Sequence, residues 1–202
     1  MIKAITLPVR LKSALPNEWS AEPCLDLVNS LFNDHTGSGD VHDRLPLPAW
    51  RRAFLAHWGY RVEDPDDRRA VLRLRELRRI LRAALEGYSS GRPIKPSLIR
   101  ALEAEINRAP LTLRITGRSG SETLVLRRTG QAWDAVTADI ATSAMRLIGE
   151  RRRVKVCSNP SCSWMFEDRS KSGSRRWCDV SICGSLINVR RHRRVSSRPI
   201  ER

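Results

Sequence analysis

Four cysteines in one short window constrain this chain more than any other feature of its sequence. They form two equally spaced pairs, Cys157-x4-Cys162 and Cys178-x4-Cys183, which are separated by fifteen residues. A zinc ion is satisfied by four thiolates at the corners of a tetrahedron, and two short loops that each carry two cysteines can supply such a set. The spacing therefore predicts a single four-cysteine zinc site.

A zinc site in which all four ligands are cysteines has no position left for water. Catalytic zinc sites typically keep one coordination position open, so we expect the ion to be structural. Elsewhere the sequence contains no Ser/His/Asp or Cys/His constellation, no phosphate-binding glycine loop and no paired-carboxylate motif. We therefore expect that this chain is not an enzyme.

Two other interpretations of the cysteines have to be weighed against zinc. The four thiols could form two disulfides, or they could be ordinary buried residues. Residues 1–15 lack the continuous apolar stretch of a signal peptide, so we expect a reducing cytoplasmic location, where disulfides are rare. Chance burial would not place four of the five cysteines in two equal pairs. The fifth, Cys24, lies among apolar positions and is expected to be a core residue.

The net charge of +15 indicates a polyanionic partner. Residues 151–202 hold 14 Lys and Arg against 4 Asp and Glu, so this segment carries +10 of the total. Neutralised nucleic-acid phosphates release counterions, which favours DNA or RNA as the partner of such a segment. The alternatives are a solubilising tail and a patch for anionic membranes. No apolar run approaches the roughly 20 residues that span a bilayer, so we expect no membrane segment.

Apolar periodicity in the first 150 residues predicts mainly helices. They are expected over residues 22–31, 49–59, 67–87 and 98–108, each with apolar positions at helical spacing. Between the first two, residues 33–43 are rich in Gly, Asp, Thr and Ser, and we expect a mobile loop in which His35 and His42 are solvated.

After Pro110 the period changes from helical to alternating. Apolar residues then alternate over residues 111–115, 124–126 and 133–137, with glycine-containing turns between them. This pattern predicts a three-stranded antiparallel meander. Asp139 is expected to cap a further helix that leads to the first zinc cysteine.

Two polar residues on the first predicted helix are candidates for ligand binding. Asp26 and Asn29 lie three residues apart and share one side of that helix, so they could recognise a small polar ligand. In the other interpretation Asp26 pairs with an arginine of the long helix, and Asn29 satisfies nearby backbone groups.

Arginines in the last part of the chain are candidates for DNA contact. Arg190, Arg191 and Arg194 fall within about 100° of one another on a predicted terminal helix, on a different face from its apolar residues. Arg175 and Arg176, beside the turn before Cys178, could bind phosphate at a second point. Because arginine can bind both guanine and phosphate, the sequence does not distinguish contacts to the bases from contacts to the DNA backbone. In the alternative interpretation, these arginines only keep an exposed helix soluble.

The cysteine segment resembles the CGNR zinc-finger family, bacterial proteins that are linked to stress and to transcription regulation. The resemblance rests on Phe166-x-Asp168, on Gly173-Ser-Arg-Arg-Trp-Cys178 and on Cys183-Gly184. Ser185-Leu186 stands where the family has Asn-Arg, so no role of that pair is carried over. The order of the preceding elements resembles the ABATE domain, which implies a domain that senses an unidentified ligand.

These patterns together predict an α+β protein. A mainly helical domain with the small meander is expected over residues 1–150, and a treble-clef-like or ribbon-like zinc module ending in a basic helix over 151–202. The expected function is a zinc-dependent transcription regulator that binds double-stranded DNA, with a small-molecule ligand and a homodimer as further candidate partners. The alternative is a zinc-stabilised protein-interaction module or a non-specific RNA- or DNA-binding module.

Overall fold

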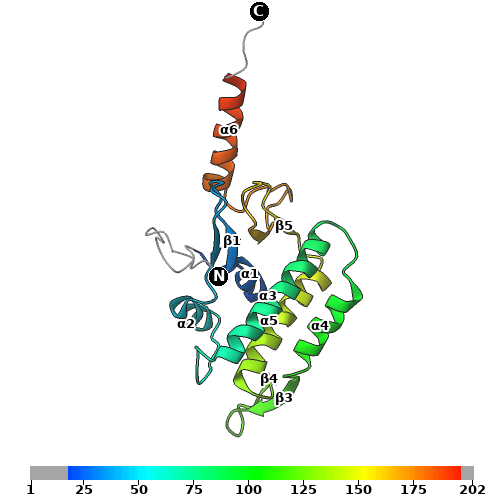
Figure 1. The fold of residues 1–202 in the computed structure, drawn as a ribbon. Helices are drawn as coiled ribbons and strands as arrows, with labels where there is room; N and C mark the ends of the chain where they lie inside the picture. Colours follow the sequence, from blue (N-terminus) through cyan, green and yellow to red (C-terminus); the bar gives the residue numbers. More distant parts are fainter. Residues whose placement is uncertain (1–17, 197–202) are drawn as a thin grey trace, which may run out of the picture.

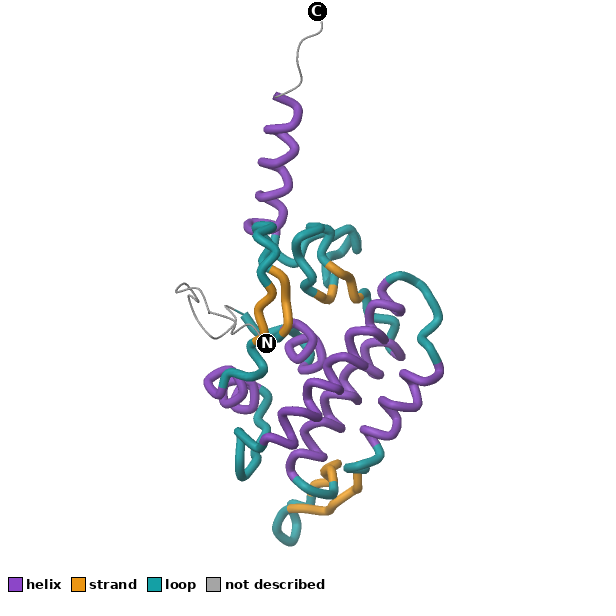
Figure 2. The backbone as a smooth tube through the Cα atoms, viewed as in Figure 1, coloured by secondary structure: helices purple, strands orange, loops and turns teal. Residues whose placement is uncertain are grey.

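The computed structural model describes residues 18–196, and side chains up to residue 192 (Figures 1 and 2). It is an α+β fold of six helices and short antiparallel strand pairs within that range. The helices are α1 (Pro23–Asn29), α2 (Pro48–His57), α3 (Arg68–Ser89), α4 (Pro96–Ile106), α5 (Ala132–Gly149) and α6 (Ser185–Ser196), with a π-helical turn η1 (Val180–Gly184) before α6. The strand pairs are β1 (Leu31–Asn33) with β2 (Val41–Asp43), β3 (Leu111–Thr116) with β4 (Thr123–Arg128), and β5 (Val154–Val156) with β6 (Met165–Glu167).

Helix α3 is the centre of the helical part, and α1, α4 and α5 all pack against it. Its carboxylate cap, Asp67, accepts hydrogen bonds from the backbone N–H groups of Arg69 and Ala70, which have no partner inside the helix. The apolar positions at helical spacing form one stripe, in which Leu74, Leu77, Leu81 and Leu85 are buried and Val71 is half-buried. This confirms the long helix predicted from the sequence.

The predicted three-stranded meander is wrong in its third strand. Residues 133–137 belong to α5, which begins at Ala132, so the sheet has only β3 and β4. Trp133 and Thr137 are four residues apart, and that spacing fits one face of a helix as well as alternate positions of a strand. Asp139 consequently lies inside α5 and forms an ion pair with Arg128 instead of capping the helix.

The segment predicted as a mobile loop is largely a β-hairpin. Strands β1 and β2 pair in the register Leu31 with Asp43 and Asn33 with Val41, which leaves only residues 34–40 as the connecting turn. Phe32 and His42 stack across the pair at 5.1 Å between ring centroids. Strands of three residues are too short for the alternation that identifies a strand in a sequence.

The strand pair β5–β6 joins the cysteine segment to the helical part. Val154 and Met165 are buried in the same apolar core as α1, α3 and α5. Helix α6 instead projects from the body of the molecule, at the end opposite to β3 and β4 (Figure 1). Within residues 18–196 the structure contains no helix that combines the length and the apolar character needed to cross a membrane.

Candidate metal centre and basic surface

The four predicted cysteines come together at one point. Their sulfur atoms all lie within 4.8 Å of one another. The distances are 3.8 Å from Cys162 to Cys178 and 3.7 Å from Cys178 to Cys183. Four sulfurs that each lie about 2.3 Å from a central zinc ion are about 3.8 Å apart at the corners of a tetrahedron. The cluster therefore has the size and the donor set of a zinc site.

Each cysteine is positioned by a short element of the module. Cys157 directly follows β5 and Cys162 precedes β6, so the first pair closes the β5–β6 turn. Cys183 lies in η1, whose first N–H groups donate to the side chain of Asp179. Cys178 donates its backbone N–H to the sulfur of Cys157 at 3.5 Å. The fold thus brings all four sulfurs to one point.

The four thiols perturb one another because they are so close. Hydrogen bonds from Cys162 and Cys178 lower the pKa of Cys157, and the bond to Cys157 raises the pKa of Cys162 and of Cys178. A divalent cation at the centre satisfies four thiolates at once. Cys24 differs, since burial raises its pKa to about 12 and it lies in the main core, as predicted.

Asn159 supports the metal centre from inside the first cysteine loop. It is fully buried, and its Nδ2 donates to the sulfur of Cys183 at 3.4 Å and to the carbonyl oxygen of His35 at 3.0 Å. Its Oδ1 accepts from the backbone of Ser161. Asn159 therefore links the metal ligands to the β1–β2 turn.

A second set of contacts, centred on Asp168, holds the segment between the two cysteine pairs in place. The buried carboxylate of Asp168 accepts from Lys155 Nζ at 2.6 Å and from the backbone N–H of Arg175 at 3.0 Å, and the bond from Lys155 is the largest cause of its lowered pKa. Lys155 also donates to the carbonyl oxygens of Gly173 and Arg175. Gly173 has φ +62°, and a Cβ there would lie 2.9 Å from Arg153.

The side chain of Arg175 makes its contacts inside the zinc module. Its guanidinium lies 4.8 Å from the ring centroid of Phe166 and donates to the carbonyl oxygens of Trp177 and Cys178. Arg175 therefore helps to position the segment before Cys178, and its DNA contact stays a prediction. Arg176 is exposed, and its guanidinium lies 5.3 Å from the ring of Trp177.

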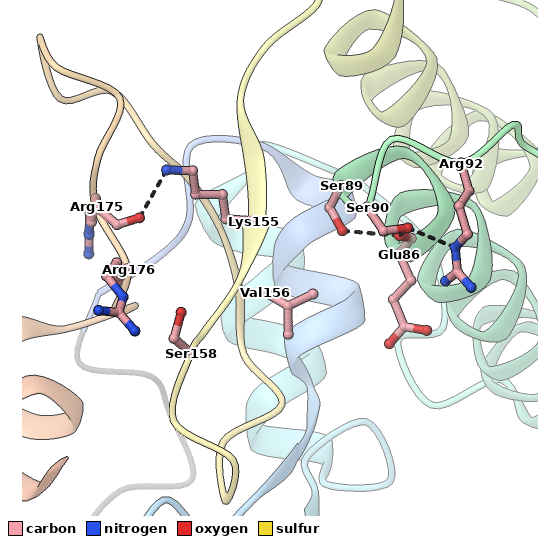
Figure 3. A pocket seen from close by; sticks show the side chains of 9 residues that line it. All are labelled: Glu86, Ser89, Ser90, Arg92, Lys155, Val156, Ser158, Arg175 and Arg176. Carbon is pink, nitrogen blue, oxygen red and sulfur yellow. Dashed lines mark hydrogen bonds between the residues drawn. The ribbon is translucent and has the colours of Figure 1, made fainter.

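A cleft of about 530 Å³ separates the end of α3 from the zinc module (Figure 3). Ser89, Ser90 and Arg92 line one side, while Lys155, Arg175 and Arg176 line the other. Lys155 pairs with Asp168 and Arg175 donates to backbone carbonyl oxygens, whereas Arg92 and Arg176 have no carboxylate partner within residues 18–196.

The predicted basic helix is present as α6, and it starts two residues after the last zinc cysteine. Arg191 is exposed, whereas Arg190 is half-buried and donates to the carbonyl oxygen of Thr36 in the β1–β2 turn. Arg194 belongs to the helix, but its side chain lies outside the described part of the chain. The predicted arginines thus lie on two segments, Arg175 and Arg176 shortly before Cys178 and Arg190, Arg191 and Arg194 on α6.

Comparison with known families agrees with this architecture. The sequence model of the ABATE family, described as "Putative stress-induced transcription regulator", matches residues 21–151, which is more than half of the chain. The chain belongs to the ABATE family. The CGNR zinc finger matches residues 153–195 and follows the ABATE domain directly. No curated protein matches the chain significantly. The four clustered cysteines are the metal site of the CGNR finger.

The ABATE domain and the CGNR finger are tied together by buried polar contacts. Asn29 donates to the carbonyl oxygen of Met165 and accepts from its backbone N–H, each at 2.8 Å. Glu22 pairs with Arg152, which also pairs with Glu167 at 2.6 Å. These contacts fix the finger on α1 of the ABATE domain.

Both candidate ligand residues of the ABATE domain have protein partners. Asp26 accepts from the backbone of Ser20 at 2.7 Å and from Trp58 Nε1 at 2.9 Å, so the predicted arginine partner is wrong. Burial is the main cause of its raised pKa. Asn29 does satisfy backbone groups, but those of the distant Met165 and not of its neighbours. Both side chains thus have structural partners, and ligand binding by Asp26 and Asn29 stays a prediction.

Sequence reasoning missed the supporting residues of the finger. Asn159 stands before a proline between two cysteines, which is a turn signal that could have indicated a side chain bonded to local backbone. Lys155 and the carbonyl of Thr36 carry no comparable signal, because their partners come from remote parts of the chain.

Proposed function

We propose that this protein is a zinc-dependent transcription regulator that binds double-stranded DNA through its CGNR finger. The observation that carries the proposal is the direct connection between the metal centre and the basic helix. Cys183 lies in η1, and α6 begins at Ser185 without an intervening loop. Any change in the geometry of the cysteine cluster is therefore transmitted to the first turn of α6.

The zinc ion has a structural role in this proposal. Cys157, Cys162, Cys178 and Cys183 would hold it, and the bound ion cross-links the β5–β6 turn to η1. All four sulfurs are used as ligands, which leaves no open position for a substrate or for water. We accordingly propose a binding protein and not an enzyme.

DNA contact is assigned to the arginines that the fold leaves accessible. Helix α6 projects from the body of the molecule (Figure 1). Arg191 on α6 is exposed, and so is Arg176 on the segment before Cys178. An α-helix fits the major groove of B-DNA, where guanidinium groups can bind guanine or the flanking phosphates. The net charge of +10 on residues 151–202 supports a phosphate-dominated affinity.

We propose that the ABATE domain modulates this contact. The β1–β2 turn binds Arg190 through Thr36, and it binds Asn159 through the carbonyl oxygen of His35. A small molecule that moves this hairpin relative to α3 would change the orientation of α6. The proposal therefore gives the ABATE domain a regulatory role through the β1–β2 hairpin.

Recovery of genomic DNA fragments on the zinc-loaded protein tests the proposal. Fragments that stay bound after competitor DNA are sequenced, in parallel for the Cys178→Ser variant and for the control Cys24→Ala, which changes the cysteine outside the cluster. We expect a few enriched sites for the wild type and the control, and none for Cys178→Ser. Uniform recovery would indicate the non-specific RNA- or DNA-binding module, and no recovery the protein-interaction module.

A further inference from the structure

The β3–β4 hairpin exposes an apolar surface that its own chain does not cover in the described structure. The strands pair in full register over six residues each, and Leu113 lies opposite Leu126 and Ile115 opposite Leu124. Residues directly opposite in an antiparallel pair share a face, and alternate residues of one strand do so too. One face of the hairpin therefore carries five aliphatic side chains, which are Leu111, Leu113, Ile115, Leu124 and Leu126. We call it the aliphatic face.

The aliphatic face gathers five exposed apolar side chains on one small hairpin, whereas the other large exposed apolar residues of the described chain are spread over several elements. Its side chains are 50–72% exposed, with the largest value at Ile115. The two strands contact mainly each other, and within residues 18–196 no third strand pairs with either edge. An isolated two-stranded hairpin is at best marginally stable in water. Contiguous exposed apolar patches of this kind mark interaction surfaces.

The hairpin is nevertheless held firmly at its base. Arg128 lies opposite Leu111, and its guanidinium donates to the carbonyl oxygens of Ala109 and Ala138 and to Thr142 of α5. It also pairs with Asp139. The base is therefore a fixed part of the helical domain, and the aliphatic face is presented in a defined direction.

We propose that the aliphatic face is the interface through which two copies of this chain form a symmetric dimer. The chain carries a net charge of +15, so two copies repel each other over most of their surfaces. The aliphatic face has no ionisable side chain apart from the paired Arg128 at its base, which makes it the surface where a second copy can approach. A two-fold axis brings the same aliphatic residues of both copies together, as an isologous interface requires.

The area available indicates the strength of this dimer. An exposed patch of this type measures a few hundred Å² on each copy, so the two faces together approach the lower limit of about 1,000 Å² for a specific interface. An interface of this size is typical of weak and reversible association. The hairpin and α6 lie at opposite ends of the molecule, so dimerisation leaves both basic helices free (Figure 1).

Sedimentation equilibrium of the full-length zinc-loaded protein tests the interface without DNA. The test variant is Leu113→Thr/Leu126→Thr, in which threonine keeps a high strand propensity. The control is Val125→Thr, which makes the same kind of change on the opposite face of β4. We expect the double variant to weaken the dimer at least tenfold and the control to leave it unchanged. Ile115→Thr, at the most exposed position, should act in the same direction.

Salt provides a second, independent readout on the unmodified chain. Added sodium chloride screens the repulsion between two positively charged copies, so we expect the dimer to tighten as salt rises. A wild-type chain that stays monomeric up to about 100 µM in high salt would overturn the proposed interface, as would equal dimerisation of the double variant and the control. Because no DNA is present, these outcomes are independent of the proposed regulator function.

Discussion

Asn29 shows how one buried side chain can join two parts of a chain. Its amide bonds Met165 as the backbone of a neighbouring strand would, because it both donates to the carbonyl oxygen and accepts from the N–H group of that residue. Met165 lies 136 residues further along the chain and in the core below the zinc site. The contact therefore fixes the position of β6, and with it the first cysteine pair, on helix α1.

The Asn29→Ala variant should be strongly destabilised. It leaves the N–H and the carbonyl group of Met165 buried without partners, which costs about 2–4 kcal/mol in the free energy of unfolding. Urea unfolding of the zinc-loaded protein measures this loss. Asn107→Ala, at an exposed position after α4, is the control and should change stability by less than about 0.5 kcal/mol. Equal effects of the two variants would contradict the role given to Asn29.

Arg175 and Arg176 are neighbours in the sequence with opposite roles in the structure. Arg175 donates to the carbonyl oxygens of Trp177 and Cys178, whereas Arg176 is exposed. We expect Arg175→Ala to lower zinc affinity about 10–100-fold, because it removes support from the second cysteine loop. Arg176→Ala should leave zinc affinity unchanged and weaken DNA binding. Competition with a chromophoric chelator measures the first effect, and equal zinc affinities in the two variants would refute the assignment.

At the scale of elements, α6 is the part of the molecule that is proposed to meet DNA. Its start is defined by the metal centre, since Cys183 lies in the turn η1 that precedes it. The β1–β2 turn holds one face of α6, since the carbonyl oxygen of Thr36 accepts a hydrogen bond from Arg190. The helix is thus oriented from both the CGNR finger and the ABATE domain.

Loss of one arginine from α6 should change the salt dependence of DNA binding. Each phosphate contact adds close to one unit to the slope of log affinity against log salt concentration, so Arg191→Ala should reduce the slope by about 1. Fluorescence anisotropy with a labelled duplex measures the slope. Arg118→Ala, in the turn between β3 and β4, removes the same charge far from α6 and should leave the slope unchanged. An unaltered slope for Arg191→Ala would place that residue away from phosphate.

The elements differ in how well the sequence alone could predict them. The helix α3 and the cysteine cluster were predicted correctly because both follow from local patterns, an apolar stripe at helical spacing and two equal cysteine pairs. The start of α5 was missed because Trp133 and Thr137 fit both periods. The link from Asn29 to Met165 could not be predicted, since no local pattern indicates a partner 136 residues away.

At the scale of the whole molecule, the ABATE domain and the CGNR finger share one core. Val154 and Met165 of the finger are buried with the leucines of α3, and Glu22 of the ABATE domain pairs with Arg152, directly before the finger. From the sequence, a domain with a small appended module was expected. The packing instead indicates that folding of the two parts is coupled.

Removal of zinc should therefore lower the stability of the whole chain. Without the ion the cysteine loops lose their cross-link, and β5–β6 is then held less firmly against the helical core. We expect differential scanning calorimetry to show one cooperative transition that moves to lower temperature when the metal is chelated. Two separate transitions, with the helical one unaffected by the chelator, would show that the parts fold independently.

The most direct test of the account is the affinity for a DNA duplex of the zinc-loaded wild type and of Cys178→Ser, measured by anisotropy over a range of salt concentrations. The central claim is that the metal centre holds α6 and the neighbouring arginines in the position in which they bind DNA. We predict tight binding with a steep salt slope for the wild type, and a loss of at least about 100-fold in the variant. Equal affinity and equal slope for the two proteins would contradict the claim, because the basic charge alone would then account for binding.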